Sequence, residues 1–87
     1  MGTLFADGFD CSIIGLVEDF NSDVVRVCYS KSKMINCLIN AGMTYEEAIE
    51  YLDYNVWNAY VGEGTPIYIN DLVCVTRQDI EEYLEFK

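Results

Sequence analysis

The strongest constraint in the sequence is a helix start signal at Thr44, which opens a stretch rich in aromatic residues. Thr44 is a favourable N-cap, and Glu47 completes a capping box, in which each side chain binds a backbone N–H that the helix leaves unpaired. Apolar residues then recur at helical spacing and predict one buried helix face. These residues are Tyr45, Ala48, Ile49, Leu52, Val56 and Ala59. Gly62 and Pro66 cannot continue this helix, and we expect a short strand over residues 65–69.

This stretch resembles a signature of small uncharacterised proteins of tailed bacteriophages and prophages. In that family a Gly-Met-Thr/Ser-Tyr-Glu-Glu-Ala segment is followed by Asn-Val and then by Val-Gly-Glu-x-Thr-Pro-Ile. The matching residues here are 42–48, 55–56 and 61–67, and the opening Phe-Ala-Asp-Gly-Phe at 5–9 is also similar. Asn58 stands where the pattern has Gly. The resemblance implies a phage-type origin and no particular activity.

The chain has 87 residues, which is enough for one compact domain over residues 1–87. A chain of this size buries only about 60–65% of its unfolded surface. Its hydrophobic fraction is nevertheless 52%. Because so small a volume cannot hide all of these groups, we expect apolar surface that is available for self-association.

The first half of the chain predicts two strands and a helix. Residues 11–18 and 24–29 are rich in β-branched side chains, and the short polar segment between them predicts an antiparallel hairpin. Ser30 or Ser32 can cap a following helix over residues 31–41.

The last quarter predicts a helix and one further short strand. Thr76 and Asp79 form a capping signal for a helix over residues 77–86, with Ile80 and Leu84 facing inward.

The resulting order is β-β-α-α-β-(β)-α, where the bracketed strand is the apolar run at 72–75. This order predicts an α+β fold, with a small, mainly antiparallel sheet and helices packed against it.

The cysteine pattern favours free thiols. Cys11, Cys28, Cys37 and Cys74 are far apart, form no Cys-x-x-Cys pair and have no histidine beside them. A zinc site would have to gather all four from scattered elements. No signal peptide is apparent, which favours a reducing compartment over a disulfide framework. We therefore expect four reduced, mostly buried thiols in the cytoplasm, and neither a metal nor a cofactor.

The side chains needed for common catalytic sites are missing. Without histidine, no Ser–His or Cys–His pair can form. The Gly-Glu-Gly segment at 62–64 follows a helix, whereas phosphate-binding loops precede one. Carboxylates four residues apart, such as Glu46 with Glu50, lie on a predicted exposed helix face, where they are usually solvated. Glu81 and Glu85 form a second pair of this kind. The sequence predicts that the protein is not an enzyme.

The net charge is −10, and residues 44–87 hold ten of the fifteen acidic residues. This charge disfavours direct binding to nucleic acid and to anionic membranes, because both carry the same sign. No apolar run approaches the length of a membrane span. We expect a candidate acidic surface on two helices, made of Glu46, Glu50, Asp53, Asp79 and Glu82. Such a surface has two interpretations: it keeps an apolar protein in solution, or it imitates nucleic-acid phosphates.

Aromatic residues give a second candidate surface. On an α-helical wheel Tyr54 and Trp57 fall opposite the apolar face, with Val61 beside them. A helix that is apolar on two sides is usually buried on both. Either another layer of this chain or a partner covers the pair.

The sequence thus leads to two functional hypotheses. The first is a small intracellular phage-type accessory protein without catalytic activity, which lies in the host cytoplasm and binds itself as a dimer or a host protein. The alternative is an acidic inhibitor that blocks a host nucleic-acid-binding or defence protein by charge mimicry.

Overall fold

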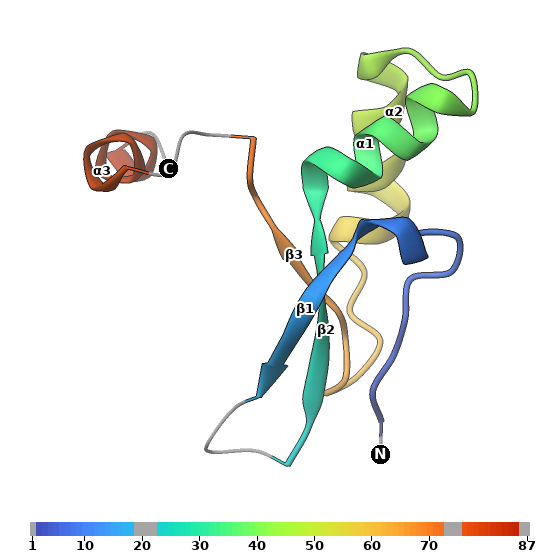
Figure 1. Cartoon of the computed structure of the whole chain (residues 1–87), viewed down its shortest axis with the longest axis vertical. Coiled ribbons are helices and arrows are strands. Elements are labelled where there is room, and N and C mark those ends of the chain that lie inside the picture. The colour runs from blue at the N-terminus through green and yellow to red at the C-terminus, as the bar shows by residue number, and fades with distance from the viewer. Residues whose placement is uncertain (1, 19–22, 73–75, 86–87) are drawn as a thin grey trace.

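The computed structural model describes residues 2–18, 23–72 and 76–85 and contains a small sheet beside a pair of helices (Figure 1). In chain order the elements are η1 (Asp10–Ser12), β1 (Ile13–Glu18), β2 (Val25–Ser30), α1 (Lys31–Asn40), α2 (Tyr45–Leu52), η2 (Asp53–Trp57), β3 (Ile67–Ile69) and α3 (Arg77–Glu85). The predicted α+β class is confirmed, because a small sheet is combined with helices that do not alternate regularly with its strands.

The sheet has the order β1-β2-β3 and is mixed. β1 and β2 pair antiparallel, with Leu16 opposite Val27 and Val17 opposite Arg26, which confirms the predicted hairpin. β3 pairs with β2 in parallel, with Tyr29 opposite Tyr68. The two helices between β2 and β3 carry the chain back to the end of the sheet where β2 starts, so both strands run in the same direction.

The bounds of all three described strands differ from the predictions. The first strand begins at Ile13, because residues 10–12 form a 3₁₀ turn instead. The second spans Val25–Ser30 where 24–29 was predicted, and the third spans Ile67–Ile69 where 65–69 was predicted. Most of the predicted turn after residue 18, and the predicted strand over 72–75 except Leu72, lie outside the described residues.

The caps of the helical pair form as the sequence predicts. Ser30, rather than Ser32, caps α1, and its Oγ accepts a hydrogen bond from the backbone N–H of Lys33 at 3.1 Å. The capping box of α2 is complete: the Glu47 N–H donates to Thr44 Oγ1 at 3.1 Å, and the Thr44 N–H donates to Glu47 Oε1 at 2.9 Å. These bonds satisfy backbone donors that the first helical turn leaves unpaired.

The core is centred on Tyr29, whose side chain is fully buried between the sheet and the helical pair. Its hydroxyl accepts a hydrogen bond from the backbone N–H of Ala6 at 2.7 Å, and its ring lies 5.7 Å from that of Tyr68. The other members of the buried cluster are Phe9, Val27, Met34, Ile35, Ala48 and Leu52. Burial raises the pKa of the Tyr68 hydroxyl, and the neighbouring Tyr29 raises it further.

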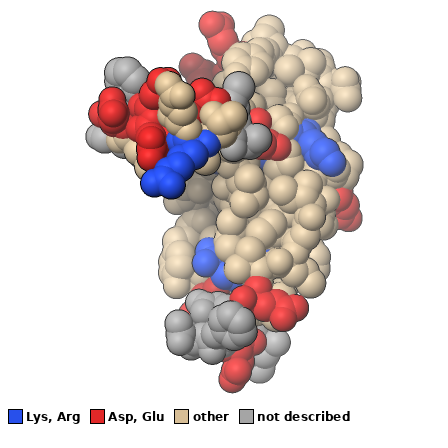
Figure 2. Space-filling view, turned by 60° about the vertical axis from the view of Figure 1, so that its left-hand side comes forward, with Lys and Arg blue, Asp and Glu red and all other residues tan. Residues whose placement is uncertain are grey.

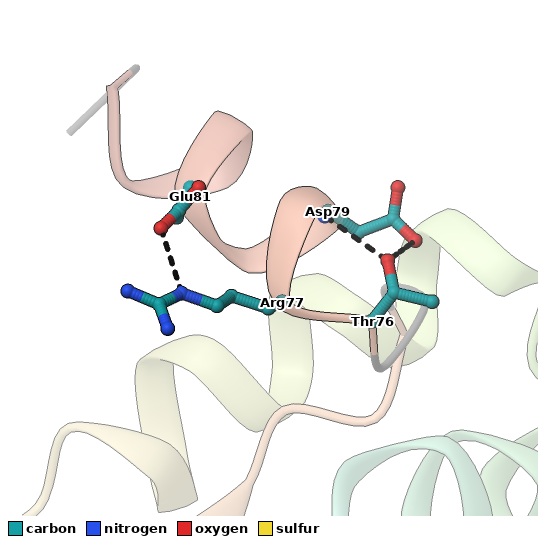
Figure 3. A network of polar contacts seen from close by, with 4 residues as sticks. All are labelled: Thr76, Arg77, Asp79 and Glu81. Atoms are coloured by element: carbon teal, nitrogen blue, oxygen red, sulfur yellow. Dashed lines mark hydrogen bonds and ion pairs between the residues drawn. The ribbon is translucent and has the colours of Figure 1, made fainter.

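The cap of α3 also forms as predicted (Figure 3). The Thr76 hydroxyl donates to Asp79 Oδ2 at 2.6 Å, and the Asp79 N–H donates to Thr76 Oγ1 at 3.2 Å. In the same helix Arg77 Nε donates to Glu81 Oε2, one turn further on, at 3.0 Å. This exposed ion pair contributes about 0.3–0.5 kcal/mol.

The prediction that Ile80 and Leu84 face inward is wrong. They are 44% and 58% exposed, and within Arg77–Glu85 no residue is buried. The reason is the position of α3, which stands clear of the sheet in Figure 1.

The prediction of four reduced thiols is also wrong in part. Cys11 and Cys37 form a disulfide that joins η1 to α1, two segments that the sequence separates by 26 residues. Packing of η1 against α1 brings these segments together, which the linear spacing does not reveal. Cys28 is free and buried, as predicted, while Cys74 lies outside the described residues. In the part of the chain that the structure describes, no helix has the length and apolar character needed to cross a bilayer.

The N-terminal segment lies directly on Gly64. The Leu4 N–H donates to the Gly64 carbonyl at 3.2 Å, and Thr3 Oγ1 donates to the Val25 carbonyl at 2.7 Å. A Cβ atom at Gly64 would overlap the backbone carbonyl of Gly2. Glycine is therefore needed here for close approach of two backbone segments.

We expect Gly64→Ala to displace the N-terminal segment and to lower the free energy of unfolding by about 1–3 kcal/mol, as overpacking does. Thermal unfolding followed by circular dichroism measures the change. Gly15→Ala is the matched control, because a Cβ at Gly15 meets no atom within 4 Å. Equal melting temperatures for Gly64→Ala and the wild type would contradict this role of Gly64.

Asp71, which follows the C-terminal end of β3, binds the start of α1 through hydrogen bonds. Its carboxylate accepts hydrogen bonds from the Ser30 hydroxyl at 2.5 Å, the Ser32 N–H at 2.9 Å and the Ser32 hydroxyl at 3.0 Å. Partial burial raises the pKa of Asp71, but the hydrogen bonds outweigh it, and the pKa lies below its ordinary value of 3.8. The charge also lies at the positive end of the helix dipole.

Asp71→Ala should cost about 1 kcal/mol of stability at neutral pH, because hydrogen bonds to a charged acceptor are lost. The folded-state pKa is lowered, so this contribution is present above pH 3.8 and is lost as the pH falls through the lowered pKa. Urea unfolding of wild type and variant between pH 7 and pH 2 should show the two stabilities converging at the acid end. A difference that stays constant down to pH 2 would argue against the carboxylate as its source.

Candidate functional site

The helix that starts at Thr44 changes its winding after Leu52, and this change arranges the candidate aromatic surface. Residues Asp53–Trp57 form a π-helical turn, η2. Asn58 closes it: its side-chain amide donates to the Asp53 carbonyl at 2.9 Å and to Asp53 Oδ1 at 2.8 Å. Asn58 has φ −102°, which any residue can adopt, so glycine is not required at this helix end.

The π-turn separates Tyr54 from Trp57. Because i→i+5 bonding puts more residues into each turn, each residue advances by less than the 100° of an α-helix. Trp57 thereby turns toward the core, while Tyr54 stays outside and is 88% exposed. The α-helical wheel used for the sequence placed the two rings on one side, and the structure does not bring them together.

Trp57 has contacts within its own chain on both its ring and its polar edge. It packs against the buried cluster, and its Nε1–H points to Met34 Sδ at 3.5 Å. The Lys31 ammonium lies 4.5 Å from the ring centroid, in the range of a cation–π contact. Its position thus ties η2 to the start of α1.

Tyr54 belongs to a larger exposed group, which we call the aromatic surface. Its members share an apolar or aromatic side chain with a large exposed fraction around η2 and the N-terminal segment. They are Phe5, Tyr51, Tyr54, Tyr60 and Val61. The predicted Val61 is 63% exposed and is therefore part of it. Tyr51 and Tyr54 are three residues apart, which makes them neighbours on a helical surface.

A shallow groove of about 220 Å³ runs through the aromatic surface. Phe5, Tyr51 and Val61 line it together with Asp7 and Asn55. Its volume is below the range of roughly 300–1,000 Å³ typical of pockets that enclose a small molecule.

The five residues of the candidate acidic surface fall on two separate helices. Glu46, Glu50 and Asp53 are exposed on α2 and η2, whereas Asp79 and Glu82 lie on α3, which stands apart in Figure 1. Figure 2 shows acidic side chains gathered over α3, while much of the neighbouring face is uncharged. The structure therefore does not join the two groups into one surface.

Some of these carboxylates are engaged locally. Asp79 accepts the Thr76 hydroxyl and Asp53 accepts the Asn58 amide, and Glu82 Oε2 accepts from Gln78 Nε2 at 3.4 Å. These bonds fix helix ends and helix faces. Glu46 lies in the first turn of α2, where negative charge favours the helix start, and Glu50 is exposed one turn later.

Sequence analysis missed Phe5, Tyr51 and Tyr60 as members of the surface. Tyr51 lies beside the predicted apolar face, and Tyr60 follows the helix end, so neither belongs to a periodic pattern. Only the excess of large rings, seven Tyr and four Phe in 87 residues, indicates that some must remain exposed.

Comparison with known proteins adds no relative. The chain matches no protein-family model, and it has no significant match among the curated proteins or the solved structures.

Two single substitutions test the separation of the two rings. Trp57→Ala removes a ring packed on the core and should cost about 3 kcal/mol. Tyr54→Ala should change stability by no more than about 0.5 kcal/mol, because its side chain touches mainly solvent. Chemical denaturation of the two variants measures both values, and a large loss for Tyr54→Ala would show that its ring is buried in solution.

Proposed function

We propose that this chain is a non-catalytic, phage-type accessory protein that binds a protein partner through the aromatic surface. The observation that carries the proposal is the 88% exposure of Tyr54 on a π-helical turn. π-turns occur frequently at functional sites. The signature at residues 42–67 supports the phage-type origin.

The composition of the surface supports a protein partner. Tyrosine is enriched at the centres of protein interfaces, because it buries a large rigid ring while its hydroxyl remains able to bond. The rings of Tyr51, Tyr54 and Tyr60 are each more than two-fifths exposed. Tyr51 and Tyr54 are neighbours on one helical surface, and exposed apolar patches on a folded protein usually mark an interaction site.

The test is affinity capture from a bacterial lysate with wild type, Tyr54→Ala and Tyr45→Ala proteins. Tyr45 is a matched control, since it is a tyrosine that is 53% exposed at the start of α2 and is not a member of the aromatic surface. We expect a partner that Tyr45→Ala retains, that Tyr54→Ala loses and that persists at high salt, because an aromatic contact is insensitive to screening. Equal capture by all three proteins would contradict the proposed role of the surface.

A second function, mimicry of nucleic acid, is favoured by one observation: carboxylates gather on the exposed face of α3 (Figure 2). This function predicts a nucleic-acid-binding partner that is released by salt. Glu82→Gln together with Asp79→Asn should weaken that partner and leave a partner of the aromatic surface unchanged. The same capture experiment therefore separates the two functions.

A further inference from the structure

The groove of the aromatic surface combines aromatic rings with an acidic side chain. The N-terminal segment supplies Phe5 and Asp7 to its lining, and the helical stretch of α2 and η2 supplies Tyr51 and Asn55. The two rings are partly accessible, since Phe5 is 60% and Tyr51 is 43% exposed. A group that enters the groove therefore meets aromatic rings and a carboxylate together.

The two polar side chains of the groove, Asp7 and Asn55, offer hydrogen-bond acceptors. Asp7 is exposed, and among the described residues none donates a hydrogen bond to its carboxylate. The side-chain amide of Asn55 donates to the Tyr51 carbonyl at 3.0 Å, and its Oδ1 remains free to accept. The described residues that line the groove include no lysine and no arginine. A complementary group must therefore bring hydrogen-bond donors and positive charge.

Three of the chain's five basic residues are engaged away from the groove. Arg26 donates to a backbone carbonyl at 2.7 Å, Lys31 lies 4.5 Å from a tryptophan ring centroid, and Arg77 forms an ion pair on α3. In the part of the chain that the structure describes, no basic residue forms an ion pair with Asp7. The net charge of −10 also attracts cationic partners to the protein as a whole. The charge of Asp7 is thus available to another molecule.

An arginine side chain matches these features better than a lysine side chain does. The planar guanidinium stacks on aromatic rings and donates two parallel hydrogen bonds to a carboxylate. It is also more weakly hydrated than an ammonium group, so that placing it against rings costs less desolvation. Arginine is enriched among the residues that contribute most to protein interfaces, whereas lysine is depleted there.

We propose that the groove receives an arginine side chain of the protein partner, with its guanidinium beside the rings of Phe5 and Tyr51 and hydrogen-bonded to Asp7. This inference rests on the proposed function, because it names the chemistry by which the aromatic surface recognises its partner. One exposed ion pair contributes little to the total affinity, so a partner held mainly by aromatic contacts still persists at high salt.

The first test is an NMR titration of the isotope-labelled full chain with N-acetyl-arginine amide at constant ionic strength. We expect saturable shifts of the backbone amide signals of Asp7, Tyr51 and Asn55 in the millimolar range. The citrulline analogue has the same length without the charge and should bind at least about fivefold more weakly, and the lysine analogue should also bind more weakly than arginine. Absence of saturable shifts with the arginine probe, or equal binding of either analogue, would overturn the proposal.

The second test repeats the titration with two variants and one matched control. Asp7→Asn removes the charge at nearly constant size and should weaken binding of the arginine probe about two- to fivefold, as loss of an exposed ion pair does. Tyr51→Leu removes the ring but keeps an apolar side chain, and we expect a similar loss. Asp23→Asn makes the same change in net charge at an exposed position just before β2 and should leave binding unchanged. Equal weakening by the two aspartate variants would reduce the effect to net charge and contradict the site.

The capture experiment separates failure of this inference from failure of the proposed function. A partner that Tyr54→Ala loses and Asp7→Asn retains in full would keep the role of the aromatic surface and rule out the arginine. A saturable arginine site without any partner that depends on Tyr54 would support the chemistry of the groove and contradict the proposed function. The NMR spectrum of each variant shows whether it is folded, and the wild-type titrations decide the proposal if a variant is not.

Discussion

Burial of Tyr29 is the interaction on which the rest of the structure depends. Its ring fills the space between the sheet and the helical pair, and it packs beside Tyr68 of the neighbouring strand. A buried hydroxyl without a partner is costly, and here the N–H of Ala6 supplies the hydrogen bond. This one side chain therefore couples β2, β3 and the N-terminal segment, and it places that segment over Gly64.

The junction of α2 and η2 links this core to function. Leu52 is fully buried at the end of α2, and Trp57 packs on the same core at the end of η2. Holding both apolar contacts requires the extra residue that a π-turn accommodates, and the residues between them are pushed outward. The exposure of Tyr54 is thus a consequence of the core contacts of Leu52 and Trp57. The interaction surface that we propose lies along a shallow groove beside this junction.

The molecule divides into a body with a packed core and a C-terminal helix that buries none of its described residues. Contacts within the chain hold the body together. They include its helix caps, the close backbone approach at Gly64 and the hydrogen bonds from the start of α1 to Asp71. Among the described residues, the contacts of α3 include its cap at Thr76, one exposed ion pair and a hydrogen bond at 3.4 Å between the Asn70 side-chain amide and the Tyr83 hydroxyl.

The sequence by itself determined the local features of this protein. The caps at Ser30, Thr44 and Thr76 and the hairpin of β1 with β2 depend on residues close together in the chain, and their hydrogen bonds form as predicted. The α+β class followed from the order of these elements, and the absence of histidine limited the chemistry.

Only the tertiary structure decided how distant segments meet. The parallel pairing of β3, the Cys11–Cys37 disulfide and the inward turn of Trp57 each depend on contacts across more than twenty residues. The exposure of Ile80 and Leu84 is of the same kind, because amphipathic periodicity shows that a helix face should be covered but not which molecule covers it.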